Sequence, residues 1–157
     1  MWASGVKASG GFKSNCKVAR FSGTTVTPST WTKIDFQTVI FDGLGELDVD
    51  TNYRWDAAAD GIYQIVAVGS IKGVPNTAGK GSMVRIYKNG AVLVVNGWEE
   101  LGTPSQNLGI YTGRTPSIAV TTVELNAGDY IEMFVYHNHT GNLLAEGCNY
   151  CTIKRIA

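Results

Sequence analysis

The sequence is poor in charged residues and proline, and each shortage excludes a class of protein. Only 17% of the 157 residues are charged, and 13 basic residues balance 13 acidic ones. This balance provides no basic stripe for nucleic acid and no polybasic segment for an anionic membrane. Four prolines beside 19 glycines do not fit a proline-rich or collagen-like chain. A nearly neutral surface with few charges favours a protein that belongs to an assembly.

Long hydrophobic runs are also missing. No stretch approaches the length of a membrane span, and residues 1–7 lack the apolar core of a signal peptide. We therefore expect no membrane insertion. We also expect the protein either to work inside the cell that makes it or to leave by a route other than ordinary secretion, such as release with a lysing phage.

The sequence contains a series of short strand patterns and no convincing amphipathic helix. The clearest pattern is 117–136, where two β-branched and aromatic runs flank a turn at 126–129 whose Gly128 can take a positive φ. Asn89-Gly90 between alternating runs predicts a second hairpin. Further strand patterns cover 17–22, 31–41, 47–55, 62–71, 83–88, 91–95 and 149–156.

The number of strands predicts the fold class. Eight to ten short strands in one domain are typical of an all-β jelly roll or an immunoglobulin-like sandwich. In one strand Trp31, Ile34, Phe36 and Val39 are expected to face inward, with a bulge that shifts the alternation. The nearly continuous apolar run at 62–71 predicts a central strand buried on both faces.

The first residues differ from the rest in composition. The segment is rich in Gly, Ser and Lys, and its apolar residues are isolated at Trp2, Val6 and Phe12. It resembles an arm more than a packed pair of strands. We expect residues 1–17 to anchor the chain to a partner and residues 18–157 to form one domain.

Three segments resemble the C1q/tumour-necrosis-factor-like jelly-roll family. Residues 56–65 (D-A-A-A-D-G-I-Y-Q-I) are similar to the entry into its central strand, and residues 84–90 (V-R-I-Y-K-N-G) to its Asn-Gly hairpin. Residues 123–131 (V-E-L-N-A-G-D-Y-I) are similar to its Gly-Asp turn. The likeness runs from about Val18 to the end of the chain. Residues 148–156 depart from it, because they lack the aromatic-x-Gly pattern of the closing strand.

The resemblance implies a jelly-roll β-sandwich that forms a homotrimer through aromatic and aliphatic surfaces. Candidates for the trimer interface or the core are Tyr63, Tyr87, Phe134 and Tyr136, and the sequence does not divide them between the two. There is no collagen-like stalk. The chain therefore resembles the stand-alone members found in phages and bacteria.

Two classes of function are compatible with this reading. The first is a structural protein of the phage virion surface, as a trimeric capsid decoration or short head fibre. Its arm would bind a capsid or tail protein, and it could contribute to adhesion to host surfaces. The second is a receptor-binding tail-fibre tip or an extracellular lectin-like module that binds host polysaccharide. Its ligand loop would be 97–114, with Trp98 and Tyr111 as stacking residues. No catalytic motif is present, so an enzyme is not expected.

The two histidines are candidate ligands of a transition metal. His137 and His139 stand at i and i+2, so on a strand they point to the same side. Three chains around an axis could then present six imidazoles to one ion. The alternative is an exposed, unliganded pair at the end of a strand.

Acidic residues and cysteines offer two further possibilities. A calcium ion could bind near Asp48 and Asp50, although the alternative is a solvated edge. The other carboxylates of this segment are those of Glu46 and Asp56. The three cysteines are either buried thiols or include one disulfide from Cys16 to Cys148 or Cys151. They are Cys16, Cys148 and Cys151.

Overall fold

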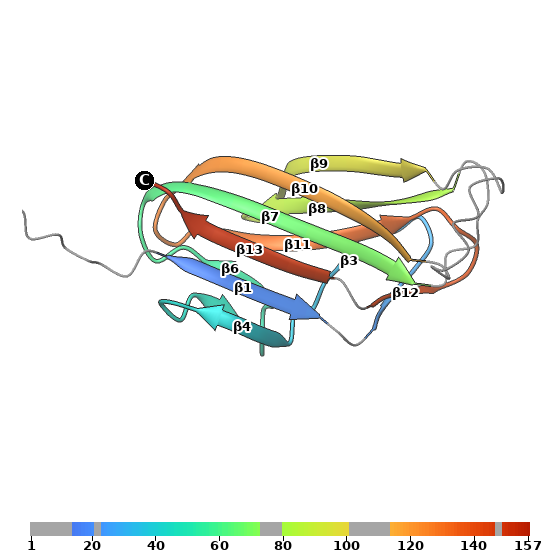
Figure 1. Cartoon of the computed structure of the whole chain (residues 1–157), viewed down its shortest axis with the longest axis horizontal. Helices are drawn as coiled ribbons and strands as arrows, with labels where there is room; N and C mark the ends of the chain where they lie inside the picture. Colours follow the sequence, from blue (N-terminus) through green and yellow to red (C-terminus); the bar gives the residue numbers. More distant parts are fainter. Residues whose placement is uncertain (1–13, 21–22, 73–79, 101–113, 147–148) are drawn as a thin grey trace, which may run out of the picture.

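The chain folds into two antiparallel sheets that pack face to face, as the computed structural model shows (Figure 1). The described residues form thirteen strands. No helix among them is long and apolar enough to cross a membrane. The structure describes residues 14–20, 23–72, 80–100, 114–146 and 149–157.

One sheet has seven strands and is centred on β7. Its strands are β1 (Asn15–Arg20), β2 (Thr24–Val26), β4 (Thr38–Asp42), β7 (Gly61–Lys72), β10 (Arg114–Leu125), β12 (Leu143–Ala145) and β13 (Asn149–Arg155). They follow the order β2-β12-β7-β13-β1-β4, and β10 pairs with the whole length of β7 along its other edge. The first and last described strands, β1 and β13, are therefore neighbours in the middle of the sheet.

The second sheet has six strands and is centred on β11. Its strands are β3 (Thr32–Lys33), β5 (Leu47–Asp48), β6 (Arg54–Asp56), β8 (Gly81–Lys88), β9 (Ala91–Glu100) and β11 (Tyr130–His137). They follow the order β5-β6-β11-β8-β9, and β3 pairs with β11 beyond the end of β6.

This arrangement confirms the predicted all-β jelly-roll sandwich. The Asn89-Gly90 hairpin is also confirmed, because φ is 52° and 77° at these residues, as a tight turn between twisted strands requires. Gly128 has a φ of 89° in the turn between β10 and β11. The Asn89-Gly90 turn therefore closes a hairpin, whereas the turn at Gly128 carries the chain from β10 in the seven-stranded sheet to β11 in the six-stranded sheet.

The predicted strand over residues 31–41 is wrong as a single element. The chain crosses from one sheet to the other within it: Ile34 donates its N–H to Met133 of β11, whereas Gln37 donates to Ala19 of β1. Ile34 and Phe36 lie in the core as expected. Val39 is 43% exposed, so it does not face inward. Alternation predicts one continuous strand, and the crossing breaks it in two.

The first strand begins earlier than predicted. It starts at Asn15, and Ser14 accepts a hydrogen bond from the N–H of Arg155. Cys16 is fully buried against β13. Residues 15–17 therefore belong to the sheet and not to the preceding arm. Trp2, Val6 and Phe12 lie outside the described residues.

The core lies between the sheets and is built by strict alternation. In β11 every second residue is buried, and the same is true of the first half of β7. Cys16 and Cys151 are part of this core as free thiols. Burial raises the pKa of Cys151 to about 12, so it remains a protonated, apolar side chain at neutral pH. Cys148 lies outside the described residues.

The two sheets approach each other closely at Gly69 of β7. A Cβ at this position would lie 2.7 Å from Val135 Cγ1 and 3.3 Å from Val84 Cβ, both on the facing sheet. Only a residue without a side chain fits there unless the sheets move apart.

We therefore predict that Gly69→Ala destabilises the fold. The added methyl group overpacks the core, which costs about 1–3 kcal/mol of unfolding free energy. Urea unfolding followed by far-ultraviolet circular dichroism measures the change. Gln64→Ala, on the exposed side of the same strand, is the matched control and is expected to change stability little. Equal stability of Gly69→Ala and the natural chain would contradict the close packing.

Candidate functional site

The outward face of the six-stranded sheet carries a row of aromatic and charged side chains. On β11 these are Tyr130, Glu132, Phe134 and Tyr136, which alternate with buried residues and are each half-buried. Each one contacts a side chain of a neighbouring strand. We call this row and its neighbours the aromatic–cationic face.

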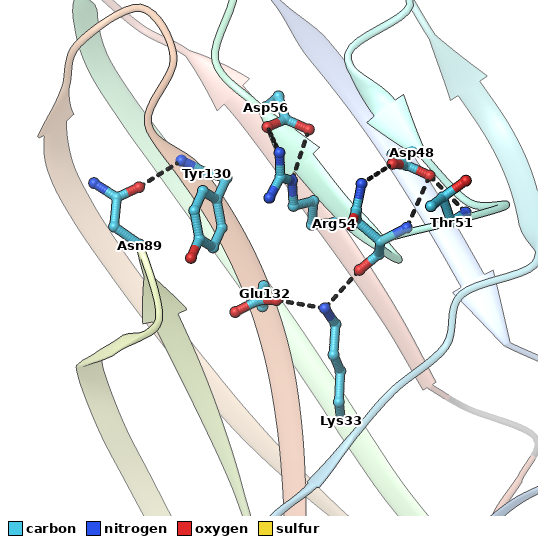
Figure 2. Close-up of polar contacts among 9 residues, drawn as sticks. Lys33, Asp48, Thr51, Arg54, Asp56, Asn89, Tyr130 and Glu132 are labelled. Atoms are coloured by element: carbon cyan, nitrogen blue, oxygen red, sulfur yellow. Dashed lines mark hydrogen bonds and ion pairs between the residues drawn. The ribbon is translucent and has the colours of Figure 1, made fainter.

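At one end of this face the charges are paired (Figure 2). Lys33 forms an ion pair with Glu132 and also donates to the carbonyl of Asn52. Arg54 pairs with Asp56 at 2.9 Å, and its guanidinium lies 4.3 Å from the centre of the Tyr130 ring. The charges of Lys33 and Arg54 are therefore each balanced by a carboxylate of this face.

At the other end of this face the aromatic rings pack in pairs. One cation there, Arg85, has no carboxylate partner among the described residues. Tyr87 lies 4.3 Å from Phe134, and Tyr136 lies 5.1 Å from Trp31, measured between ring centres. The Arg85 guanidinium covers the Trp31 ring at 3.9 Å. Its Nε is buried and has no hydrogen-bond partner within the part of the chain that the structure describes. Trp31 thus lies on the outside of the sheet, whereas its place in the alternating pattern predicted an inward position.

The acidic segment near β5 is organised by its own backbone. Asp48 accepts hydrogen bonds from the N–H groups of Thr51 and Asn52 and from the side-chain amide of Asn52 (Figure 2). These bonds stabilise the carboxylate and lower its pKa to about 2. The carboxylate oxygens of Asp48, which were candidate calcium ligands, accept hydrogen bonds from this turn instead.

The neighbouring carboxylates of this segment are also engaged by the protein. Glu46 is buried and accepts from the Ser14 hydroxyl, the Trp55 indole N–H and the Ala58 N–H. Asp56 is paired with Arg54. Among the described residues, no three His, Cys, Asp or Glu side chains converge as a metal site would require.

The two histidines do lie on the same side, as predicted, but they face the inside of the sandwich. His137 is fully buried and His139 is 3% exposed. The Nε2 of His137 lies 2.9 Å from the carbonyl of Val26, and its Nδ1 accepts the N–H of His139. Both nitrogens of His137 are occupied, and neither ring reaches the surface. This placement does not present the pair to a metal on a molecular three-fold axis.

A small cleft opens between the sheets beside β5. Its lining is mostly apolar, with Phe36, Leu47, Val49 and Cys151 among the side chains. The thiol of Cys151 is protonated at neutral pH, so it is no nucleophile there.

The outward face of the seven-stranded sheet has a different chemistry. Ile118 and Val120 of β10 are 53% and 48% exposed, and they stand directly opposite Val68 and Val66 of β7. Tyr150 of β13 continues the row beyond Val68. We call these five residues the apolar face.

The predicted interface aromatics are divided by the structure. Tyr63 is fully buried, and its hydroxyl donates to the carbonyl of Ala59. Tyr87, Phe134 and Tyr136 lie on the aromatic–cationic face, where they stack in pairs. The sequence did not single out the apolar face, although Ile118, Val120 and Thr122 occupy successive exposed alternate positions in the middle of β10.

The predicted ligand loop is shorter than expected. The strand β9 continues to Glu100, so the backbone of Trp98 belongs to a strand, and β10 begins at Arg114. Tyr111 lies outside the described residues.

Comparisons with known proteins agree with this fold. No family model and no curated protein matches the chain. The globular domain of zebrafish complement 1qA protein superposes with a TM-score of 0.62 at 12% identity, over 92% of this chain and 98% of that chain. Murine APRIL at pH 5.0 gives 0.59 at 13% identity, over 92% and 99%. The protein therefore has the C1q/TNF-like jelly-roll fold, as its motifs predicted.

The buried His139 predicts a pH-dependent stability. Burial lowers its pKa, and the charges of His137 and Lys80 lower it further. The unfolded chain therefore takes up a proton first as the pH falls below about 6.5. The free energy of unfolding is expected to decrease from there, by at most about 1.4 kcal/mol per pH unit for this group.

Urea unfolding between pH 8 and pH 5 measures this slope. The variant His139→Leu lacks the titrating group, so its stability is expected to fall less over the same range. Asp48 and Asp129 have a pKa lowered to about 2, so their own contributions are lost only below about pH 4. Parallel curves for the variant and the natural chain would contradict the assignment to His139.

Proposed function

We propose that the protein is a structural, non-enzymatic component of a phage virion surface. In this proposal it is a homotrimeric capsid decoration or short head-fibre protein, anchored by its N-terminal arm. The apolar face of the seven-stranded sheet is the observation that carries the proposal. Three such faces packed around an axis would remove Ile118 and Val120 from water, which stabilises an assembly by about 25 cal/mol per Å² of buried apolar surface.

The direction of the chain supports anchoring at one end. Ser14, where the described chain begins, bonds to Arg155, and the C terminus lies at the same end of the sandwich (Figure 1). The start of β10 pairs with the end of β7 at the opposite end, at Arg114 and Lys72. A partner that holds residues 1–13 would therefore leave the opposite end pointing outward.

A receptor-binding tail-fibre tip or extracellular lectin-like module is the second candidate. The aromatic–cationic face favours it, because stacked rings beside an uncompensated guanidinium are suited to ligand binding. Trimer formation through the apolar face would leave this face free, since it lies on the opposite side of the sandwich.

The trimer is tested by light scattering of the purified protein. We expect a mass of about three times 16.9 kDa. In Ile118→Glu a carboxylate would be buried without a partner at the interface, so we expect a monomer at concentrations where the natural chain is trimeric. Val92→Glu, at an equally exposed apolar position on β9, is the control and should remain trimeric. A monomeric natural chain would overturn the proposed trimer.

Anchoring is tested by deleting residues 1–13. Ser14 is retained because its hydroxyl donates to the buried Glu46. We expect the shortened protein to remain a trimer and to keep its thermal stability. We also expect it to lose attachment to phage particles that lack this protein, measured by co-sedimentation. Undiminished attachment would place the anchor in the jelly roll.

A further inference from the structure

We propose that the end of the aromatic–cationic face around Arg85, away from Arg54, binds a carboxylate-bearing saccharide, with Arg85 binding the carboxylate and Trp31 forming part of the aromatic surface beside it. The proposal deepens the surface role and rests on it only in assuming that the face points outward. Its central observation is that Arg85 is held against Trp31 and that its guanidinium has no hydrogen-bond acceptor or ion-pair partner among the residues that the structure describes.

The charge of Arg85 is not compensated by the protein. Lys33, Arg54 and Lys88 each form an ion pair with a carboxylate on the same sheet or its turns. In the described part of the chain, Arg85 forms neither an ion pair nor a hydrogen bond, and its Nε is shielded from water. A partly desolvated guanidinium without acceptors costs free energy, and a ligand carboxylate would offset that cost.

The orientation of Arg85 is already set. Its guanidinium lies 3.9 Å from the centre of the Trp31 ring, and Trp31 packs against Tyr136 at an interplanar angle of 31°. Stacking of this kind fixes the planar group without consuming its N–H donors. Little side-chain entropy is then lost when a carboxylate binds, so the geometry favours two parallel N–H···O bonds.

The surroundings favour a sugar over a peptide. Trp31, Tyr136, Phe134 and Tyr87 form two stacked pairs along neighbouring strands and are all half-buried. The rings of the two pairs are tilted by 31° and 37°, and this row offers aromatic surface against which the C–H groups of a sugar ring can pack. The strands beneath are paired on both edges at this point, since β8 lies between β11 and β9. No free strand edge is therefore offered to a peptide backbone by this part of the sheet.

The ligand class follows from these two features together. The aromatic rings favour a ligand with an apolar C–H face, and the guanidinium of Arg85 favours a planar anion. A uronic acid unit within a polysaccharide combines both. Neutral sugars would lack a group for Arg85, and a phosphate would not use the aromatic row.

The test is calorimetric titration of the full-length protein with a short oligogalacturonate. A neutral glucose oligomer of the same length and a glutamate oligomer are titrated in parallel. We expect binding of the oligogalacturonate only. Arg85→Gln should weaken it about tenfold or more, because a charge-assisted pair is lost. Trp31→Ala should weaken it as well.

Arg54→Gln is the matched control, since Arg54 also stacks on a ring of this face but is already paired with Asp56. It should change the affinity by less than about twofold. Arg85→Lys keeps the positive charge, and it provides the same test if Arg85→Gln fails to fold. It should still bind more weakly than the natural chain, because an ammonium cannot form the two parallel bonds.

Several outcomes would overturn the proposal. They are no binding of oligogalacturonate, equal binding of the neutral oligomer, and equal loss in Arg54→Gln and Arg85→Gln. Equal binding of the glutamate oligomer would assign the face to acidic peptides instead. Light scattering of the same samples reports the trimer independently, so a failure of saccharide binding is distinguishable from a failure of the proposed assembly.

Discussion

The pairing of β13 between β1 and β7 is the constraint on which the rest of the structure depends. It brings the two ends of the described chain together in the middle of one sheet, through six residue pairs on each side of β13. These contacts join residues more than 80 positions apart, so their loop-closure entropy must be offset by the core that they complete. The buried side of this ladder includes Ile65, Ile153 and Cys16.

Once the sandwich is closed, its two outward faces acquire different roles. The seven-stranded sheet keeps Ile118 and Val120 exposed to water, which favours burial against another surface. The six-stranded sheet instead places Arg54 and Arg85 over aromatic rings, and carboxylates neutralise Lys33 and Arg54. One face is thus suited to assembly and the other to remaining in solvent, as the proposed virion-surface role requires.

Two buried polar groups affect stability in opposite ways. One fixes a junction between the sheets, and the other makes stability depend on pH. Glu46 ties Ser14 to Trp55 and Ala58, so it fixes the start of the first strand to the second sheet. His139, by contrast, has an Nε2 that is buried without a partner. A satisfied buried carboxylate stabilises a junction, whereas an unsatisfied imidazole makes the opposite end of the sandwich sensitive to protonation.

The sequence by itself determined the all-β class and the Asn89-Gly90 hairpin, because alternation and turn residues act over a few neighbouring residues. Asn89-Gly90 and Gly128 are such local signals. The resemblance of the sequence to the C1q/tumour-necrosis-factor-like family narrowed the sandwich to a jelly roll. Only the tertiary structure decided which side of each strand meets the core and which side meets water. It placed Trp31 outside beside Arg85 and His137 inside against Val26. Alternation gives two faces without naming them, and the choice is made by strands that pair across the whole length of the chain.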